Sequence, residues 1–73
     1  MYIHGKDRQQ ALQEASRIAI AGGSYRYVYQ DPQGFYRIES VPPILHGNPL
    51  YPSLTSYVVA GYNGSNYEVQ VST

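Results

Sequence analysis

The chain has 73 residues, no cysteine, and five basic residues balanced by five acidic ones. A chain of this length forms one domain with a thin core, since it buries only about 60% of its extended surface on folding. Without cysteine, neither a disulfide nor a thiolate metal site can supplement that core. We therefore expect a single small domain over residues 1–73, supplemented by self-association or by docking onto a partner.

The balance of charge also bears on the partner. Zero net charge disfavours nucleic acid, because neutralising phosphates takes a basic surface. No apolar run approaches the length of a membrane span, and the first seven residues lack the apolar segment of a signal peptide. We therefore expect a cytoplasmic protein with no membrane partner.

The first element that the pattern predicts is a helix over roughly residues 8–21. Asp7 has the side chain of a helix N-cap, and Gln10 follows it at the spacing of a capping box. Two glycines, Gly22 and Gly23, are expected to end the helix, because glycine takes the left-handed conformation at little cost. Apolar side chains form one stripe at helical spacing: Ala11, Leu12, Ala15, Ile18 and Ala19.

A β-hairpin is predicted next, with strands over about 24–30 and 35–41. The tetrad Asp31-Pro32-Gln33-Gly34 between them suits a type I turn followed by a glycine bulge. Pairing Asp31 with Phe35 then fixes the register of the whole hairpin. In that register the opposite residues are Val28 and Ile38, Gln30 and Tyr36, Arg26 and Ser40, Tyr27 and Glu39, and Tyr29 and Arg37.

Residues 42–53 contain four prolines, so they are excluded from an inner strand, where each would lack a ladder donor. We expect an extended, stiffened connection. Its apolar residues, Ile44, Leu45, Leu50 and Tyr51, are too many to be all exposed. Either they cap the open end of the core, or some of them insert into a partner.

A second hairpin is predicted from residue 54 to residue 71, because Asn63-Gly64 is a strong hairpin signal between two alternating runs. A two-residue and a four-residue loop both place Val58 opposite Val69. Met1 to His4 is the candidate for a short edge strand. The predicted fold is α+β: one N-terminal helix packed on a mostly antiparallel sheet of two β-hairpins.

Nine tyrosines are the most distinctive feature of the composition, and Tyr25, Tyr27 and Tyr29 alternate along one predicted strand. Two arrangements are open: the rings lie under the helix, or Val28, Ile38, Val58 and Val69 do and the rings lie on an open face. The second is favoured, because Arg37 and Glu39 share the tyrosine side and burying both would cost several kcal/mol unless they were well paired.

An open row of tyrosines beside an arginine has the composition of a protein-binding hot spot. The candidate partner-binding residues are Tyr25, Tyr27, Tyr29, Arg37 and Glu39. The predicted function is that of a non-catalytic protein-binding module. Two alternatives use the same features: single-stranded nucleic-acid binding by tyrosine stacking, and a structural homodimer formed through the tyrosine face or an edge strand.

Enzymatic chemistry is not indicated by the sequence. The two histidines, His4 and His46, lack the spacing of metal ligands. The carboxylates are scattered, and no motif places a serine beside His46. We therefore expect no catalytic residues, no metal and no cofactor.

The layout as a whole, with a helix from Arg8 to Ala21 and tyrosine-rich hairpins over Tyr25 to Ser40 and Leu54 to Val71, resembles that of small phage-encoded inhibitor proteins, among them anti-CRISPR proteins. The resemblance is one of size and element order. It implies a protein that blocks a host complex by binding to it, without catalysis, and it carries no site residues over to this chain.

Overall fold

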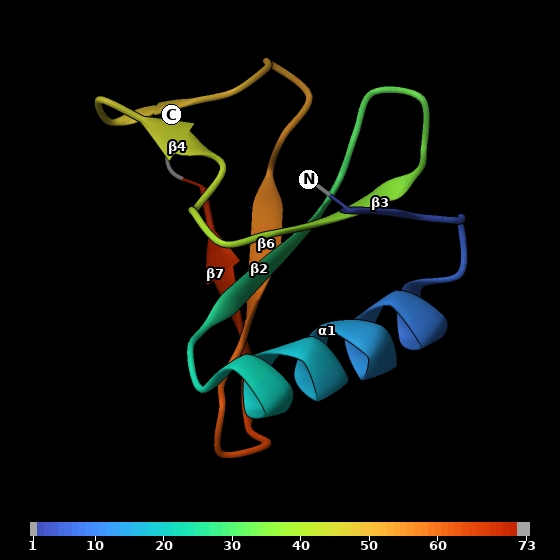
Figure 1. Cartoon of the computed structure of the whole chain (residues 1–73). Coiled ribbons are helices and arrows are strands. Elements are labelled where there is room, and N and C mark those ends of the chain that lie inside the picture. The colour runs from blue at the N-terminus through green and yellow to red at the C-terminus, as the bar shows by residue number, and fades with distance from the viewer. Residues whose placement is uncertain (1, 72–73) are drawn as a thin grey trace.

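The computed structural model describes residues 2–71, with side chains from residue 5 onward. One helix lies across one face of a five-stranded antiparallel sheet with the strand order β1-β3-β2-β6-β7 (Figure 1). The helix is α1 (Arg8–Gly22), and the strands of this sheet are β1 (Tyr2–His4), β2 (Arg26–Gln30), β3 (Tyr36–Glu39), β6 (Ser56–Ala60) and β7 (Asn66–Gln70). The predicted α+β fold is confirmed, including the edge strand near the N-terminus.

The helix begins and ends where the sequence predicts. The side chain of Asp7 accepts a hydrogen bond from the Gln10 N–H at 3.2 Å, which satisfies one of the free donors of the first turn. Gly23 has a φ of 69°, and its N–H donates to the Ala19 carbonyl at 2.9 Å. The left-handed cap therefore stops the helix at Gly22.

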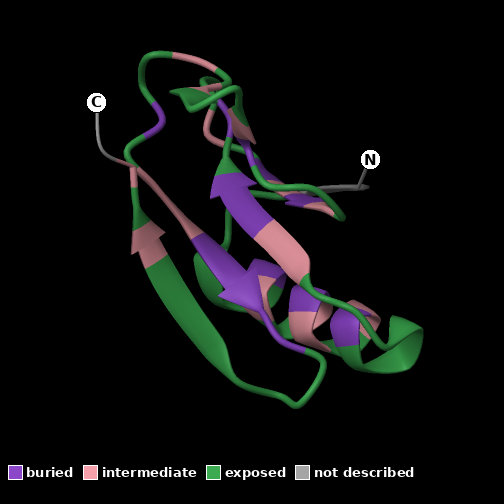
Figure 2. Ribbon diagram, turned by 90° about the vertical axis from the view of Figure 1, so that its left-hand side faces the viewer, coloured by how far each residue is buried: buried purple, intermediate pink, exposed green. Residues whose placement is uncertain are grey.

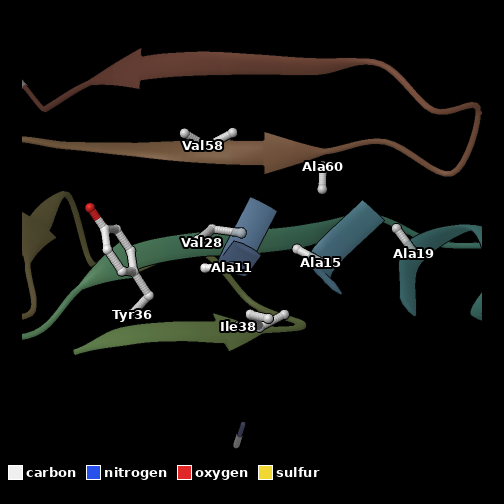
Figure 3. Close-up of a cluster of buried hydrophobic side chains, with 8 residues drawn as sticks. All are labelled: Ala11, Ala15, Ala19, Val28, Tyr36, Ile38, Val58 and Ala60. Atoms are coloured by element: carbon white, nitrogen blue, oxygen red, sulfur yellow. The ribbon is translucent and has the colours of Figure 1, made fainter. Parts of the chain in front are cut away.

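The core lies between the helix and the sheet. Figure 3 shows three helix alanines, Ala11, Ala15 and Ala19, over the strands, and none of the three has any exposed surface. The sheet side of this core is formed by Val28, Tyr36, Ile38, Val58 and Ala60. Small side chains on the helix allow the backbones to approach closely, and the larger side chains of the sheet fill the space between the two layers. The predicted placement of Val28, Ile38 and Val58 under the helix is confirmed, whereas that of Val69 is wrong.

The register of the first hairpin is also as predicted. The Asp31 N–H donates to the Phe35 carbonyl at 2.8 Å, and the Gly34 N–H donates to the Asp31 carbonyl at 3.0 Å. Gly34 has a φ of 95°, which is the bulge conformation that favours glycine. The ladder ends with the Tyr27–Glu39 pair, one pair short of the expected pairing between Arg26 and Ser40.

In the second hairpin the predicted register is wrong by one residue. Val58 lies opposite Glu68, and Val69 lies opposite Tyr57. The loop has three residues, since the Gly61 N–H donates to the Ser65 carbonyl at 2.7 Å. Gly64, with a φ of 89°, supplies the same bulge as Gly34 does in the first hairpin. A loop with an odd number of residues places every residue of the return strand on the other side of the sheet from the side predicted with an even loop. Val69 therefore lies on the face away from the helix.

Residues 42–53, here called the proline arm, form a folded arm where an extended connection was expected. The arm contains a second, two-stranded sheet of β4 (Ile44–Leu45) and β5 (Asn48–Pro49). His46 and Gly47 make the turn with φ values of 53° and 81°. Two successive positive values are the signature of a tight hairpin turn. The arm and the β6–β7 loop lie at opposite ends of the main sheet (Figure 1).

Candidate functional site: a tyrosine face with two ends

The face of the sheet opposite the helix carries the candidate residues. Val28 belongs to the core under the helix, so its neighbours Tyr27 and Tyr29 point to the other side. The strand pairings extend this face across the sheet, with Tyr27 next to Val59 and Val59 next to Tyr67. The structure thus settles the side on which the tyrosines lie, and it is the side that the charge argument favoured.

The predicted open row is nevertheless only partly open. Tyr25 is 47% exposed, whereas Tyr29 is 5% exposed. Tyr27, Arg37 and Glu39 are half-buried. The proline arm covers one end of the row, so the expectation of an uninterrupted binding surface of three tyrosines is wrong for Tyr29.

At the covered end, a buried carboxylate holds the first hairpin together. The Asp31 side chain accepts hydrogen bonds from the N–H groups of Gln33 at 3.0 Å and Phe35 at 2.9 Å. Its second oxygen accepts from Nε of Arg37 at 3.1 Å, and only 3% of the Asp31 side chain is exposed. Arg37, predicted as a partner-binding residue, is therefore bound to the body of the protein by an ion pair.

The titrating groups of the covered end reflect this environment. Burial raises the pKa of Asp31, but the hydrogen bonds from Phe35, Arg37 and Gln33 outweigh it, so the pKa lies below its ordinary value. Burial raises the pKa of Tyr51 to about 12 and also raises the pKa of Tyr29. Both phenols are thus held neutral.

Tyr51 of the proline arm closes a gap in the sheet. The β2–β6 ladder ends at the Val28–Val58 pair, and beyond it the two strands separate. Asp31 is hydrogen-bonded to the strand partner Phe35, and bonded and non-bonded pairs alternate along an antiparallel ladder. Gln30 is therefore in a non-bonded pair with β3, and its carbonyl points away from β3 into this gap. The Tyr51 hydroxyl donates to that carbonyl. The arm is therefore fixed to the sheet by the same ring that lies 6.4 Å from the ring of Tyr29.

Two hollows flank this junction. One, of about 250 Å³, is lined by Leu50 and Tyr51 of the arm together with Tyr29 and Arg37. The other, of about 320 Å³, lies where β2 and β6 separate, and its wall includes Gln30, Ser53, Thr55 and Ser56. Both are small, and the larger one is mainly polar, so neither combines the volume and the apolar lining that are typical of a cofactor site.

Toward the open end, five tyrosines form what is here called the open patch: Tyr25, Tyr27, Tyr57, Tyr62 and Tyr67. Tyr57, which also lines the larger hollow, is the member nearest the covered end. Tyr25 and Tyr62 make an edge-to-face pair with ring centroids 5.3 Å apart, and Tyr27 lies 6.1 Å from Tyr57. Tyr62 and Tyr67 are 52% and 55% exposed.

Three members of the open patch, Tyr57, Tyr62 and Tyr67, are absent from the residues predicted as a site. For Tyr57 the sequence held the necessary information, because Tyr57 directly precedes Val58 in its strand and must point to the opposite side of the sheet. For Tyr67 the signal was hidden by the register error, because pairing Val58 with Val69 would place Tyr67 on the helix side.

The open patch carries no formal charge. The nearest charged partner fixed by the ladder is Glu39, which lies opposite Tyr27. Arg26 is on the helix side of its strand, where its guanidinium donates to Ser24 Oγ at 2.6 Å and to the Tyr25 carbonyl at 3.0 Å. The patch therefore offers flat rings and hydroxyl groups with no cation among them.

Other kinds of site find no support among the described residues. Within residues 2–71, no group of three His, Cys, Asp or Glu side chains comes together as metal ligands would. In that same part of the chain, no helix combines the length and apolarity that crossing a bilayer requires. His46 is an exposed turn residue. The side chain of His4 lies outside the described residues.

No protein-family model, no curated protein and no solved structure matches the chain.

Proposed function

We propose that this protein is a non-catalytic protein-binding module and that its contact surface is the open patch. One observation carries the proposal. Three rings that are about half exposed, Tyr25, Tyr62 and Tyr67, lie at one end of a sheet face whose other end is covered by the chain itself. Exposed aromatic residues gathered in this way mark interaction surfaces.

The chemistry of the residues fits a protein partner. Tyrosine is enriched at interface hot spots, because its ring buries a large area while its hydroxyl keeps a hydrogen bond. The ring pairs Tyr25–Tyr62 and Tyr27–Tyr57 also restrain the side chains before any partner arrives. Less rotamer entropy is then lost on binding.

Nucleic acid is the weaker alternative, for an electrostatic reason. Stacking platforms for single strands combine aromatic rings with a positive groove that follows the phosphates. Here the adjacent charge is Glu39, Arg37 is paired with Asp31, and the whole chain is neutral. The rings alone do not supply the electrostatic part of the affinity.

The resemblance to small phage-encoded inhibitors extends the proposal to the kind of partner, which is a complex of the host. On that basis the protein acts in the cytoplasm and blocks a host complex by occupying one of its surfaces. The support for this part is the size, the neutral composition and the element order of the chain.

Affinity capture tests the proposal. Immobilised wild-type protein is exposed to lysate of the source organism or its host, and retained proteins are identified by mass spectrometry. The Tyr62→Ala/Tyr67→Ala variant removes two exposed rings, and Ile20→Ala serves as a matched control, because Ile20 is 55% exposed on the helix. We expect a protein retained by the wild type and by the control but not by the double variant.

The affinity for the purified partner then makes the test quantitative. We expect the double variant to weaken binding about 30-fold or more, which is the effect of losing one hot spot of about 2 kcal/mol. Equal retention by the double variant would contradict the proposal. Binding of a labelled single-stranded oligonucleotide that weakens steeply with salt would favour the alternative instead.

A further inference from the structure

The strand β7 forms one edge of the main sheet and is exposed along most of its length (Figure 2). The helix packs on β2, β3 and β6. It reaches β7 through polar side chains: Ser16 Oγ lies 3.2 Å from Asn66 Oδ1, and Arg8 Nη2 lies 3.7 Å from Glu68 Oε2. No described residue pairs with the outer side of β7 in the sheet.

The hydrogen bonds of the β6–β7 hairpin decide which backbone groups of β7 point outward. The Gly61 N–H donates to the Ser65 carbonyl at 2.7 Å, and the Val71 N–H donates to the Thr55 carbonyl at 2.8 Å. Bonded and non-bonded pairs alternate in an antiparallel ladder, so the odd-numbered residues of β7 direct their backbone groups to β6. The even-numbered residues direct theirs to the open edge: Asn66, Glu68 and Gln70.

This edge lacks the features that usually prevent strand pairing. Proteins shield their edges with short strands, lysines, prolines or bulges. The opposite edge strand, β1, has three residues, whereas β7 has five. Among the five residues of β7, Glu68 alone is charged, and none is a lysine or a proline. That charge already lies near Arg8. The edge is therefore an open template for another strand.

We propose that β7 pairs antiparallel with β7 of a second copy of this chain, about a two-fold axis at Val69. The inference goes beyond the proposed function and does not depend on it. In such a dimer the outward N–H and carbonyl groups of one β7 must pair with the outward groups of the other, which restricts the register. The three registers with most overlap have their two-fold axes at Tyr67, Glu68 or Val69.

Charge and side-chain pairing select among the three registers. An axis at Glu68 sets this carboxylate directly opposite its own copy, and like charges so placed are destabilising. An axis at Tyr67 pairs Tyr67 with itself but sets Val69 opposite Ser65, so only one of its pairs joins two large side chains. An axis at Val69 instead pairs Glu68 with Gln70, Tyr67 with Val71, and Val69 with itself. Aromatic and β-branched residues facing each other across strands are stabilising pairs.

The pairing has a consequence for the tyrosine face. A two-fold axis at an antiparallel strand pair stands perpendicular to the sheet, so both helices lie on one side. Both open patches then lie on the other side, where Tyr67 of each copy flanks the junction. The two patches become one surface on a continuous ten-stranded sheet, and the neutral charge of each copy adds no long-range repulsion.

Sedimentation equilibrium tests the pairing on the intact protein. We expect the wild type to dimerise with rising concentration and Gln70→Pro to stay monomeric. Proline removes an outward N–H and leaves the β6 ladder intact, because position 70 does not bond to β6. Gln70→Ala keeps the N–H and is expected to dimerise as the wild type does. A wild type that is monomeric up to about 1 mM would overturn the proposal, since that dissociation constant corresponds to only about 4 kcal/mol of association free energy.

The register is tested by charge at position 70, with variants that keep every backbone group. Gln70→Lys places a cation opposite Glu68 of the other copy, and Gln70→Glu places an anion there. Because each dimer holds two such pairs, we expect about 2- to 30-fold tighter dimerisation for the first and a similar weakening for the second. Equal dimerisation constants for the two variants would overturn the register.

Cysteine substitution gives an independent readout even if the proline variant fails to fold. The native chain has no cysteine, so each variant carries a single thiol. At the axis the Cα atoms of Val69 in the two copies would lie about 4.5 Å apart, close enough for a disulfide. We expect Val69→Cys to cross-link under mild oxidation and Glu68→Cys not to. Cross-linking of Glu68→Cys alone, or of neither variant, would overturn the proposal.

Discussion

The two ends of the tyrosine face share one sheet and one residue type, yet they differ in nearly every physical respect. At the covered end Tyr29 is 5% exposed, and Tyr51 donates its hydroxyl to the backbone of β2. At the open end Tyr67 is 55% exposed. The strand pattern is the same at both ends. The difference arises from the proline arm, which folds over one end and leaves the other.

This contrast separates two uses of tyrosine. Under the arm, the buried ring of Tyr29 fills space, and the hydroxyl of Tyr51 donates to a backbone carbonyl of β2 beyond the end of the β2–β6 ladder. At the open patch, the ring contributes less to folding and is available for contact. Substitutions at the two ends should therefore affect different quantities, namely stability at the first and binding at the second.

The largest expected effect is that of Tyr29→Ala. Truncating a buried aromatic side chain leaves a cavity, and we expect the free energy of unfolding to fall by about 3–5 kcal/mol. For a domain of this size that is a large share of the total. Urea unfolding followed by circular dichroism measures the change. A loss below about 1 kcal/mol would show that the arm does not bury this ring in solution.

Asp31→Asn should have the next largest effect, because the amide cannot replace a carboxylate that accepts three hydrogen bonds. We expect the melting temperature to fall by roughly 10 °C. In the wild type the folded pKa of Asp31 is depressed. Its stabilising contribution is therefore complete above the ordinary value of 3.8 and is lost as the pH falls through the lower folded value.

Thermal melts of both proteins from pH 2 to pH 7 test this assignment. The wild type should lose stability on the acid side more steeply than Asp31→Asn does. Parallel acid limbs for the two proteins would mean that another carboxylate is responsible.

Tyr51→Phe should cost about 1 kcal/mol, the usual net value of one hydrogen bond, since it removes the donor to the Gln30 carbonyl and keeps the ring. The pKa of Tyr51 is raised to about 12 from an ordinary 10.0. The neutral phenol thus stabilises the fold below pH 10, and this contribution is lost as the pH rises toward 12. Chemical unfolding at pH 7 and pH 11 measures both effects, and an unchanged pH dependence in the variant would disprove the link.

The smallest expected effect on stability is that of Tyr67→Ala at the open end. We expect less than about 0.5 kcal/mol, as for most exposed positions. The same variant should weaken partner binding, so its stability curve also validates it as a binding probe. A stability loss comparable to that of Tyr29→Ala would remove the distinction between the two ends.

The two hairpins show how far local sequence determines a register. Both use a three-residue loop with a glycine in the left-handed conformation, Gly34 in the first and Gly64 in the second. The first register could be predicted because Pro32 fixes the start of the turn. In the second, Asn63-Gly64 suits loops of two, three or four residues, and the choice of three shifted every later residue to the other face.

What the sequence determined by itself was local: the helix with its Asp7 and Gly23 caps, the strands of the main sheet, and the face on which Tyr27 and Tyr29 lie. These features follow from side-chain periodicity and from the conformations that individual residues favour. Tertiary structure decided which tyrosines stay open, since that depends on where the proline arm packs. Arm packing is a contact between residues about 20 apart, such as Gln30 and Tyr51, and no periodicity encodes it. The same applies to Tyr67, whose side of the sheet was decided by one residue of loop length.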